Sequence, residues 1–179
     1  LVHRLARSMA VRPEAQMAEA LQGVEGAYSL LVLINDTLLA ARDPNGWRPL
    51  VMGMLGDAVV FASETCALDI VGATLVREVL PGEIVAVDRD GLRSHQLPAA
   101  SPLHRCVFEH VYFARPDSHL LGRSVYEVRR ELGVQLATEY PLQADVVVPV
   151  PETAIPAAIG YAETLGIPLQ MGLTKNRYI

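Results

Sequence analysis

Apolar and polar residues follow two different patterns along the chain, and the pattern changes across the segment 106–118. Before this segment, short apolar runs separated by Gly, Asp, Asn and Pro predict antiparallel β-structure. After it, an amphipathic helical pattern, a continuous apolar run and a second helical pattern predict an α/β unit. We therefore expect two domains, at 1–103 and 104–179, joined through the proline-containing stretch 97–102.

The first domain is predicted to begin with helical segments and to continue as hairpins. Residues 1–10 have helical spacing, and Pro13 followed by Glu14 favours the start of a second helix. We expect Met17, Leu21 and Val24 to form its apolar stripe. The strand at 27–34 is expected to be buried, and a short helix at 66–71 to be capped by Ser63. The remaining predicted strands are 38–41, 51–55, 58–62, 83–87 and 92–97.

The second domain is predicted to begin with a capped helix. Ser124 and Glu127 match a capping box, in which each side chain accepts a hydrogen bond from the other residue's backbone N–H. The expected apolar face of the helix holds Val125, Val128, Leu132 and Leu136, and the expected polar face holds Arg129, Arg130 and Glu131.

A continuous apolar run at 145–150 follows this helix. Such a run is typical of a strand buried on both faces of a parallel sheet. A further helix is expected at 157–165, ended by Gly166, with the next strand starting at Ile167. Strand, short turn and helix form the arrangement in which anions bind near a helix N-terminus.

The loop 42–50 contains three charged residues, two prolines and the single tryptophan of the chain. It reads Arg-Asp-Pro-Asn-Gly-Trp-Arg-Pro-Leu, in which two prolines and an Asn-Gly pair exclude a regular element. Such a loop either belongs to a functional site or is a tight turn in which Arg42 and Asp43 satisfy the backbone, and local chemistry favours the turn. Cys66 lies among alanine and leucine and is expected to be a small core residue.

Composition narrows the class of protein. With 179 residues, 51% of them hydrophobic, the chain fits a soluble globular protein. The net charge of -5 is spread without a basic block, which argues against a nucleic-acid partner. No apolar stretch approaches the length of a membrane span and no signal-peptide pattern is present, so we expect no membrane partner and a cytoplasmic location. The two cysteines are expected to be reduced.

Four places carry residues that could bind ligands. Thr153, after the 145–150 run, has a hydroxyl that could ligate Mg²⁺, although local chemistry favours a helix N-cap. The cluster 175–178 offers Lys and Arg to phosphate oxygens, but by itself is typical of a solvated loop. Cys106 has no second thiol nearby in sequence and by itself predicts a buried apolar residue. Arg115 and Asp117 are expected to form a structural ion pair.

Several motifs occur together in one order. They are the 42–50 loop, Ala-Ser-Glu-Thr-Cys-Ala-Leu-Asp at 62–69, Leu-Pro-Gly-Glu at 80–83, Cys-Val-Phe-Glu-His-Val-Tyr-Phe-Ala-Arg-Pro-Asp-Ser at 106–118, Val-Pro-Glu-Thr at 150–153 and Lys-Asn-Arg-Tyr at 175–178. With this set the chain resembles the amidophosphoribosyltransferases, also called glutamine phosphoribosylpyrophosphate amidotransferases, over nearly its whole length. The first loop is shared more widely among glutamine amidotransferases, and Trp47 stands where an isoleucine is usual.

The resemblance implies a fold and an activity. The fold would be the C-terminal part of an N-terminal-nucleophile hydrolase αββα sandwich, followed by the start of a type I phosphoribosyltransferase α/β domain. One domain would hydrolyse glutamine, and the ammonia would displace pyrophosphate from phosphoribosyl pyrophosphate in the other. The product would be 5-phosphoribosylamine, in the first committed step of de novo purine (IMP) biosynthesis. Purine nucleotides would inhibit the enzyme, and it would be a homo-oligomer, a tetramer in the family.

The resemblance also implies roles for particular residues. Thr153 matches the residue whose hydroxyl is associated with Mg²⁺. Cys106 matches the first cysteine ligand of a [4Fe-4S] cluster that some members contain, although a cysteine also stands there in members without a cluster. The start of the flexible loop that closes over phosphoribosyl pyrophosphate is matched by Lys175, Asn176, Arg177 and Tyr178.

The resemblance further implies that the nucleophilic cysteine and the Asp-Asp ribose-binding signature lie outside 1–179. We therefore expect an internal fragment that carries no catalytic residue and is inactive alone. One alternative is a non-catalytic relative or fragment that keeps the fold as a binding or assembly module. Another is an amidotransferase of the sugar-phosphate type, which the motifs at 150–153 and 175–178 disfavour.

Overall fold

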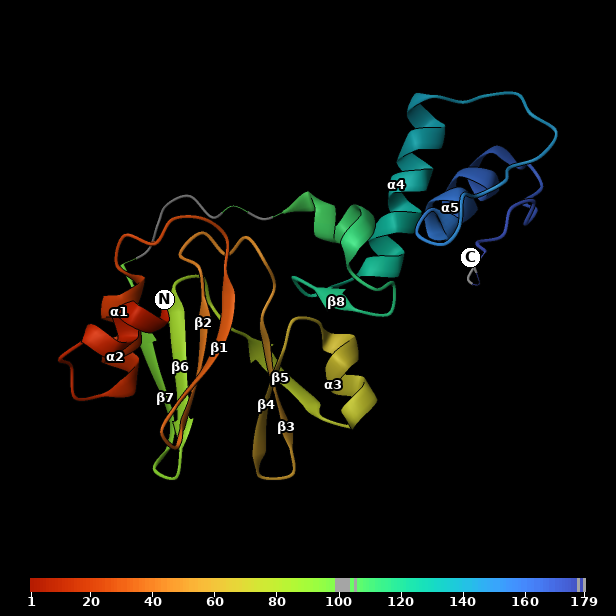
Figure 1. Ribbon diagram of the computed structural model, residues 1–179. Helices are drawn as coiled ribbons and strands as arrows, with labels where there is room; N and C mark the ends of the chain where they lie inside the picture. Colours follow the sequence, from red (N-terminus) through yellow and green to blue (C-terminus); the bar gives the residue numbers. More distant parts are fainter. Residues whose placement is uncertain (99–103, 105, 177, 179) are drawn as a thin grey trace. The chain divides into compact units, whose positions relative to one another are not determined.

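The chain folds as two compact units, Leu1–Cys106 and Val107–Ile179, coloured red to green and green to blue in Figure 1. The computed structural model describes residues 1–98, 104, 106–176 and 178. No helix within these ranges is long and apolar enough to cross a membrane.

The first unit contains two antiparallel sheets and three helices. The helices are α1 (Val2–Arg7), α2 (Pro13–Leu21) and α3 (Thr65–Val71). The first sheet has the strand order β1-β2-β6-β7, formed by Ser29–Ile34, Thr37–Arg42, Glu83–Asp88 and Gly91–Gln96. The second sheet has the order β4-β3-β5, formed by Ala58–Ala62, Val51–Leu55 and Thr74–Glu78.

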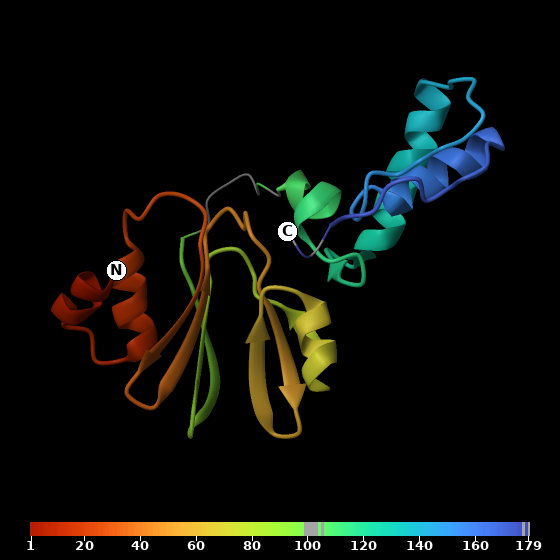
Figure 2. The ribbon, with the colours of Figure 1, turned by 45° about the vertical axis from the view of Figure 1, so that its right-hand side comes forward.

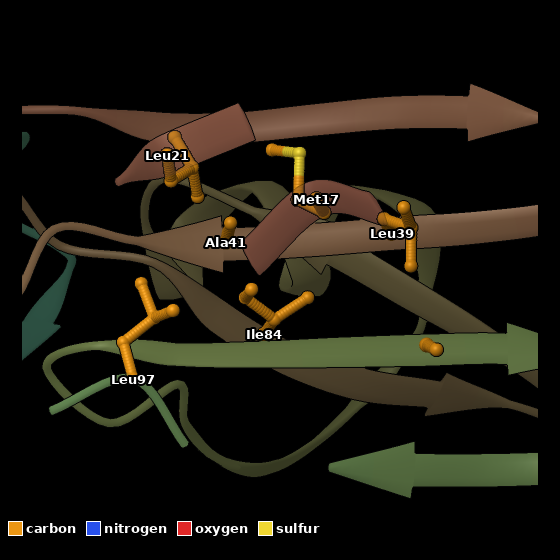
Figure 3. Close-up of a cluster of buried hydrophobic side chains, with 7 residues drawn as sticks. Met17, Leu21, Leu39, Ala41, Ile84 and Leu97 are labelled. Carbon is orange, nitrogen blue, oxygen red and sulfur yellow. The ribbon is translucent and has the colours of Figure 1, made fainter. Parts of the chain in front are cut away.

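These elements stack in the order helix, sheet, sheet, helix, which can be followed in Figure 2. Successive side chains of a strand point to opposite faces, so Leu39 and Ala41 of β2 face α2 whereas Ala40 faces the second sheet. Met17 of α2 packs on the first face (Figure 3). The far side of the second sheet is covered by α3 through Leu68. The alternation of the strands thus supplies all three apolar interfaces.

Most of the predicted elements of this unit are confirmed. The hairpin turn at Asn35 and Asp36 forms, with Asn35 in the left-handed region at φ 50°. The hairpins β3–β4 and β6–β7 also form. The strand β5 was not predicted. Its two apolar residues, Leu75 and Val76, are adjacent in sequence, so the segment lacks the alternation of a half-buried strand. Both side chains are exposed in the structure.

Three expectations for this unit are wrong. Val24 lies beyond the end of α2 and is exposed. Ser63 does not cap α3, whose N-cap position is Glu64 without a side-chain hydrogen bond. The strand β1 is not buried: Leu31 and Leu33 are 51% and 69% exposed. It is an edge strand, and only its face toward α2 is covered.

The second unit begins with a π-helix and contains two longer helices. The π-helix η1 spans Glu109–Phe113 and is followed by a short hairpin of β8 (His119–Leu120) and β9 (Arg123–Ser124). Helix α4 spans Val125–Glu139, and Ser124 caps it by accepting the Glu127 backbone N–H at 3.4 Å, which is the Ser124 half of the predicted capping box. Helix α5 spans Ile155–Leu165 and ends at Gly166 in the left-handed region, also as predicted.

The buried face of α4 differs from the predicted one. Leu132 and Leu136 are 46% and 51% exposed, whereas Arg129, expected on the polar face, is 2% exposed. The helix packs through small residues: a Cβ on Gly133 would meet the Ala157 carbonyl oxygen at 1.9 Å. The backbones of α4 and α5 therefore approach closely, and the large leucines are excluded from the contact.

The run 145–150 does not form the predicted strand. It makes one parallel bridge, between Val147 and Leu169, in which the Val147 N–H donates to Pro168 O at 2.8 Å. The parallel direction agrees with the prediction, but Val150 is exposed. A central parallel strand requires neighbours on both sides, and the described residues supply one.

Candidate functional site

A pocket of about 650 Å³ lies in the second unit, where two segments distant in sequence meet. The turn after the 145–150 run supplies one wall, and the segment that follows Leu169 supplies the other. The lining residues are Pro151, Glu152, Ile155, Met171, Leu173, Thr174, Lys175, Asn176 and Tyr178.

Three of the four residues predicted in the 175–178 cluster line this pocket. Lys175 contributes an ammonium group, Asn176 an amide and Tyr178 a phenol. The Asn176 side-chain oxygen accepts the Tyr178 backbone N–H at 2.9 Å. Arg177 lies outside the described residues. The pocket thus joins the cluster to the Val-Pro-Glu-Thr turn, as a shared ligand site would require.

The start of α5 contributes a positive electrostatic end to the same pocket. Ile155, the first residue of the helix, is part of the lining, and Pro156 occupies the first turn. The Ile155 N–H already donates to the Glu152 carbonyl oxygen and Pro156 has no N–H, so the helix favours an anion chiefly through its dipole. The Lys175 ammonium adds to this effect. The Glu152 carboxylate lies in the same lining and would oppose a bare phosphate. This combination of charges suits an anion that is accompanied by a cation.

Thr153 lies next to the pocket but outside its lining. It is half-buried and stands between Glu152 and the N-cap residue of α5, which is Ala154. The prediction that Thr153 itself caps the helix is therefore wrong, because the helix begins at Ile155, one residue later than a Thr153 cap would require. The Pro151–Glu152 peptide bond that precedes it is cis.

Metal and cluster ligands are sparse in the described part of the chain. It contains no group of three or more His, Cys, Asp or Glu side chains that could hold a metal ion. Cys66 is buried in the first unit, as predicted. Cys106 is a free thiol and only half-buried, so the prediction of a buried residue is wrong. A [4Fe-4S] cluster needs four thiolates, so these residues do not fit one by themselves. Mg²⁺ takes few protein ligands and completes its shell with water and phosphate, which the Glu152 and Thr153 oxygens fit.

The loop 42–50 is a braced turn within the first unit. The Arg42 guanidinium donates to the carbonyl oxygens of Arg48 and Val79 at 2.8 Å and of Gly46 at 3.2 Å. The Asp43 carboxylate accepts the backbone N–H groups of Asn45 and Trp47. The tight-turn interpretation is therefore confirmed. Burial, aided by the Asp43 charge, raises the pKa of the neighbouring Tyr28.

Arg115 and Asp117 form the predicted ion pair. Their closest atoms lie 2.7 Å apart and both side chains are largely exposed. The hydrogen bond from Arg115 lowers the pKa of Asp117. Neither residue lines the pocket, so the pair is structural.

Sequence reasoning missed part of the lining. Glu152 lies within the Val-Pro-Glu-Thr motif, which gave no indication of its position in the lining, and Met171 and Leu173 lie outside the motifs. Their only sequence signal is proximity to the motifs, because segments brought together by a single bridge leave no periodic pattern.

Comparison with known proteins first shows which class of protein the chain resembles. Residues 4–69 match the family described as a glutamine amidotransferase domain, which is of the N-terminal-nucleophile type. The whole chain is 47% identical to amidophosphoribosyltransferase 1 of Arabidopsis thaliana and covers 32% of that protein. It is 46% identical to amidophosphoribosyltransferase of Bacillus subtilis and covers 38% of it.

Solved structures agree with these relatives. The glutamine phosphoribosylpyrophosphate amidotransferase from B. subtilis, complexed with ADP and GMP, matches 99% of the chain with a TM-score of 0.93 and 45% identity. The match covers 39% of that protein. Over its whole length, the chain is therefore homologous to 32–39% of an amidophosphoribosyltransferase, and the resemblance drawn from the motifs is confirmed.

Proposed function

We propose that this chain is the middle part of a glutamine-dependent amidophosphoribosyltransferase. In this proposal the first unit belongs to an αββα N-terminal-nucleophile glutaminase, and the second unit is the start of a type I phosphoribosyltransferase domain. The observation that carries the proposal is that identity of 46–47% to these enzymes extends through both units. A module retained only for its glutaminase-like fold would have no reason to keep the second unit.

The proposed reaction has two coupled steps. Glutamine is hydrolysed to glutamate and ammonia, and the ammonia nitrogen then attacks C1 of phosphoribosyl pyrophosphate. The C1–oxygen bond breaks, pyrophosphate leaves with its electron pair, and 5-phosphoribosylamine forms. The second step needs a pocket that binds a pyrophosphate group and keeps water away from an electron-poor C1.

The pocket of the second unit has the chemistry for this binding. The Lys175 ammonium and the N-terminus of α5 would attract the pyrophosphate. Mg²⁺, when bound with the substrate, would neutralise part of the pyrophosphate charge, and Glu152 and Thr153 are its candidate neighbours. Asn176 and Tyr178 would contribute hydrogen-bonding groups from the same loop.

We also propose that purine nucleotides regulate the complete protein and that it works in the cytoplasm as a homo-oligomer. The support for nucleotide binding is the B. subtilis structure, which is complexed with ADP and GMP.

The deciding experiment uses the protein that contains this chain, supplied with glutamine, phosphoribosyl pyrophosphate and Mg²⁺. We expect equal amounts of pyrophosphate and phosphoribosylamine, and glutamate production that phosphoribosyl pyrophosphate stimulates. Lys175→Ala should raise the KM for phosphoribosyl pyrophosphate at least tenfold and leave the KM for glutamine unchanged. The exposed Arg123→Ala is the matched control. Glutaminase activity without pyrophosphate release would reject the proposal, and product formation from fructose 6-phosphate would support the sugar-phosphate type instead.

A further inference from the structure

The rings of Trp47 and His104 stack on each other within the first unit. Their centroids lie 5.0 Å apart and the ring planes differ by 12°. The backbone N–H of His104 also donates to the carbonyl oxygen of Asn45 at 3.0 Å. Two independent contacts therefore join the residue at 104 to the loop 42–50.

The loop side of this contact is rigid. The Trp47 backbone N–H donates to the Asp43 carboxylate at 3.1 Å, and the neighbouring Gly46 carbonyl accepts from the buried Arg42. Arg42 lies at the end of β2, a central strand of the first sheet. The indole is thus held by a hydrogen-bonded chain that begins in the core.

The other side of the contact is exposed. His104 is exposed, and it stands two residues before the end of the first unit at Cys106. An exposed residue outside helices and strands loses considerable backbone freedom when it is fixed, so an ordered contact here must offset that loss. Aromatic stacking and one backbone hydrogen bond are the interactions that do so.

We propose that Trp47 and His104 form a clasp that fixes the point at which the chain leaves the first unit. The clasp ties His104 to the braced loop 42–50 by one stacking contact and one backbone hydrogen bond. This inference depends only on the first unit and stands whether or not the proposed function is correct.

The single tryptophan makes the clasp measurable, because all tryptophan fluorescence of the chain comes from Trp47. In the full chain, His104→Ala should increase the acrylamide quenching constant of Trp47 about twofold, since one indole face becomes open to solvent. His104→Phe keeps an aromatic ring and should restore the wild-type constant. The exposed His3→Ala on α1 is the matched control and should change nothing.

Hydrogen exchange at position 104 provides the second measurement. The amide bonded to Asn45 should exchange roughly threefold to tenfold faster in Trp47→Leu and in His104→Ala, the range expected for losing one aromatic pair. In His104→Phe the exchange should stay at the wild-type rate. Circular dichroism and the exchange of β2 and β6 amides verify that each variant is folded. Unchanged quenching in His104→Ala, or unchanged exchange at 104 in both stacking variants, would overturn the proposal.

Discussion

Gly133 of α4 lies directly against the carbonyl group of Ala157 in α5. A Cβ at Gly133 would stand 1.9 Å from that oxygen and 2.7 Å from the carbonyl carbon, distances at which the backbone must move. Gly160 occupies the reciprocal position, where a Cβ would meet the Arg130 carbonyl oxygen at 2.1 Å. The two glycines set the separation of the only two α-helices in the described part of the second unit, and with it the place where α5 begins beside the pocket.

Gly133→Ala should destabilise the second unit by about 3 kcal/mol, because overpacking against backbone finds no flexible side chain to displace. Better helix propensity offsets less than about 1 kcal/mol of this loss. Urea unfolding followed by circular dichroism measures the effect. Gln135→Ala, on the exposed face of the same helix, should stay within about 0.5 kcal/mol of wild type. If the two variants had equal free energies of unfolding, the backbones of α4 and α5 would not lie as close together at Gly133 as described.

Arg129 connects α4 to the π-helix η1. Its Nε donates to His110 O at 2.6 Å and its Nη2 to Ala114 O at 2.8 Å, so it satisfies carbonyl groups at the end of η1. Arg129→Lys cannot reproduce this planar fork and should cost about 2 kcal/mol in the free energy of unfolding. The neighbouring Arg130→Lys, whose ion pair with Glu163 is exposed, should cost less than about 0.5 kcal/mol. A similar loss in both variants would contradict the assignment.

Arg42→Lys tests the bracing of the loop 42–50. Lysine can replace at most part of the hydrogen bonds that Arg42 donates to Gly46, Arg48 and Val79, so we expect a loss of about 2 kcal/mol in stability. The emission maximum of Trp47 should shift to longer wavelength as the loop loosens. Arg89→Lys, in an exposed turn, is the control for the same chemical change. An unshifted Trp47 spectrum would mean that the loop is held without Arg42.

Glu83 should make stability depend on pH. Burial by itself would raise the pKa of this carboxyl group, but hydrogen bonds from Arg77, Ser94 and the Leu80 N–H outweigh burial and lower the pKa. Because the folded-state pKa lies below the unfolded value of about 4.3, the stabilisation is complete above that pH and is lost as the pH falls further.

Glu83→Gln should therefore destabilise the chain by about 2 kcal/mol at pH 7 and flatten the acid side of the stability curve. The exposed Glu25→Gln should leave both unchanged. Thermal unfolding between pH 3 and pH 7 makes the comparison. If Glu83→Gln and wild type lost stability equally as the pH falls, that loss would come from other carboxylates.

Thr153→Val tests the proposed metal role in the protein that contains this chain. Removing the hydroxyl while keeping the shape should raise the Mg²⁺ concentration for half-maximal phosphoribosylamine synthesis about tenfold, with glutamine hydrolysis unaffected. Thr138→Val, exposed on α4, is the matched control. An unchanged Mg²⁺ dependence would leave Thr153 with a structural role only.

The sequence predicted the strands of the first unit well and the packing of the second unit poorly. Strand alternation and turn residues act over a few neighbouring positions, so the hairpins β1–β2, β3–β4 and β6–β7 could be located without a structure. Leu132 and Leu136 of α4 predicted the wrong buried face, because hydrophobicity was weighed without the shape of the partner helix. The close approach required at Gly133 and Gly160 favours small residues over large apolar ones.

For the candidate site, too, some features could be predicted from the sequence and others only from the tertiary structure. The motifs at 150–153 and 175–178 indicated residues that line the pocket and the family resemblance, because residue types in a fixed order are themselves a sequence property. Tertiary structure decided that the bridge between Val147 and Leu169 brings these motifs to one pocket, and that Glu152 lies in its lining while Thr153 stands beside it. It also decided that Trp47 stacks on His104. Contacts between residues far apart in the chain depend on how whole elements pack, and local pattern carries no record of that packing.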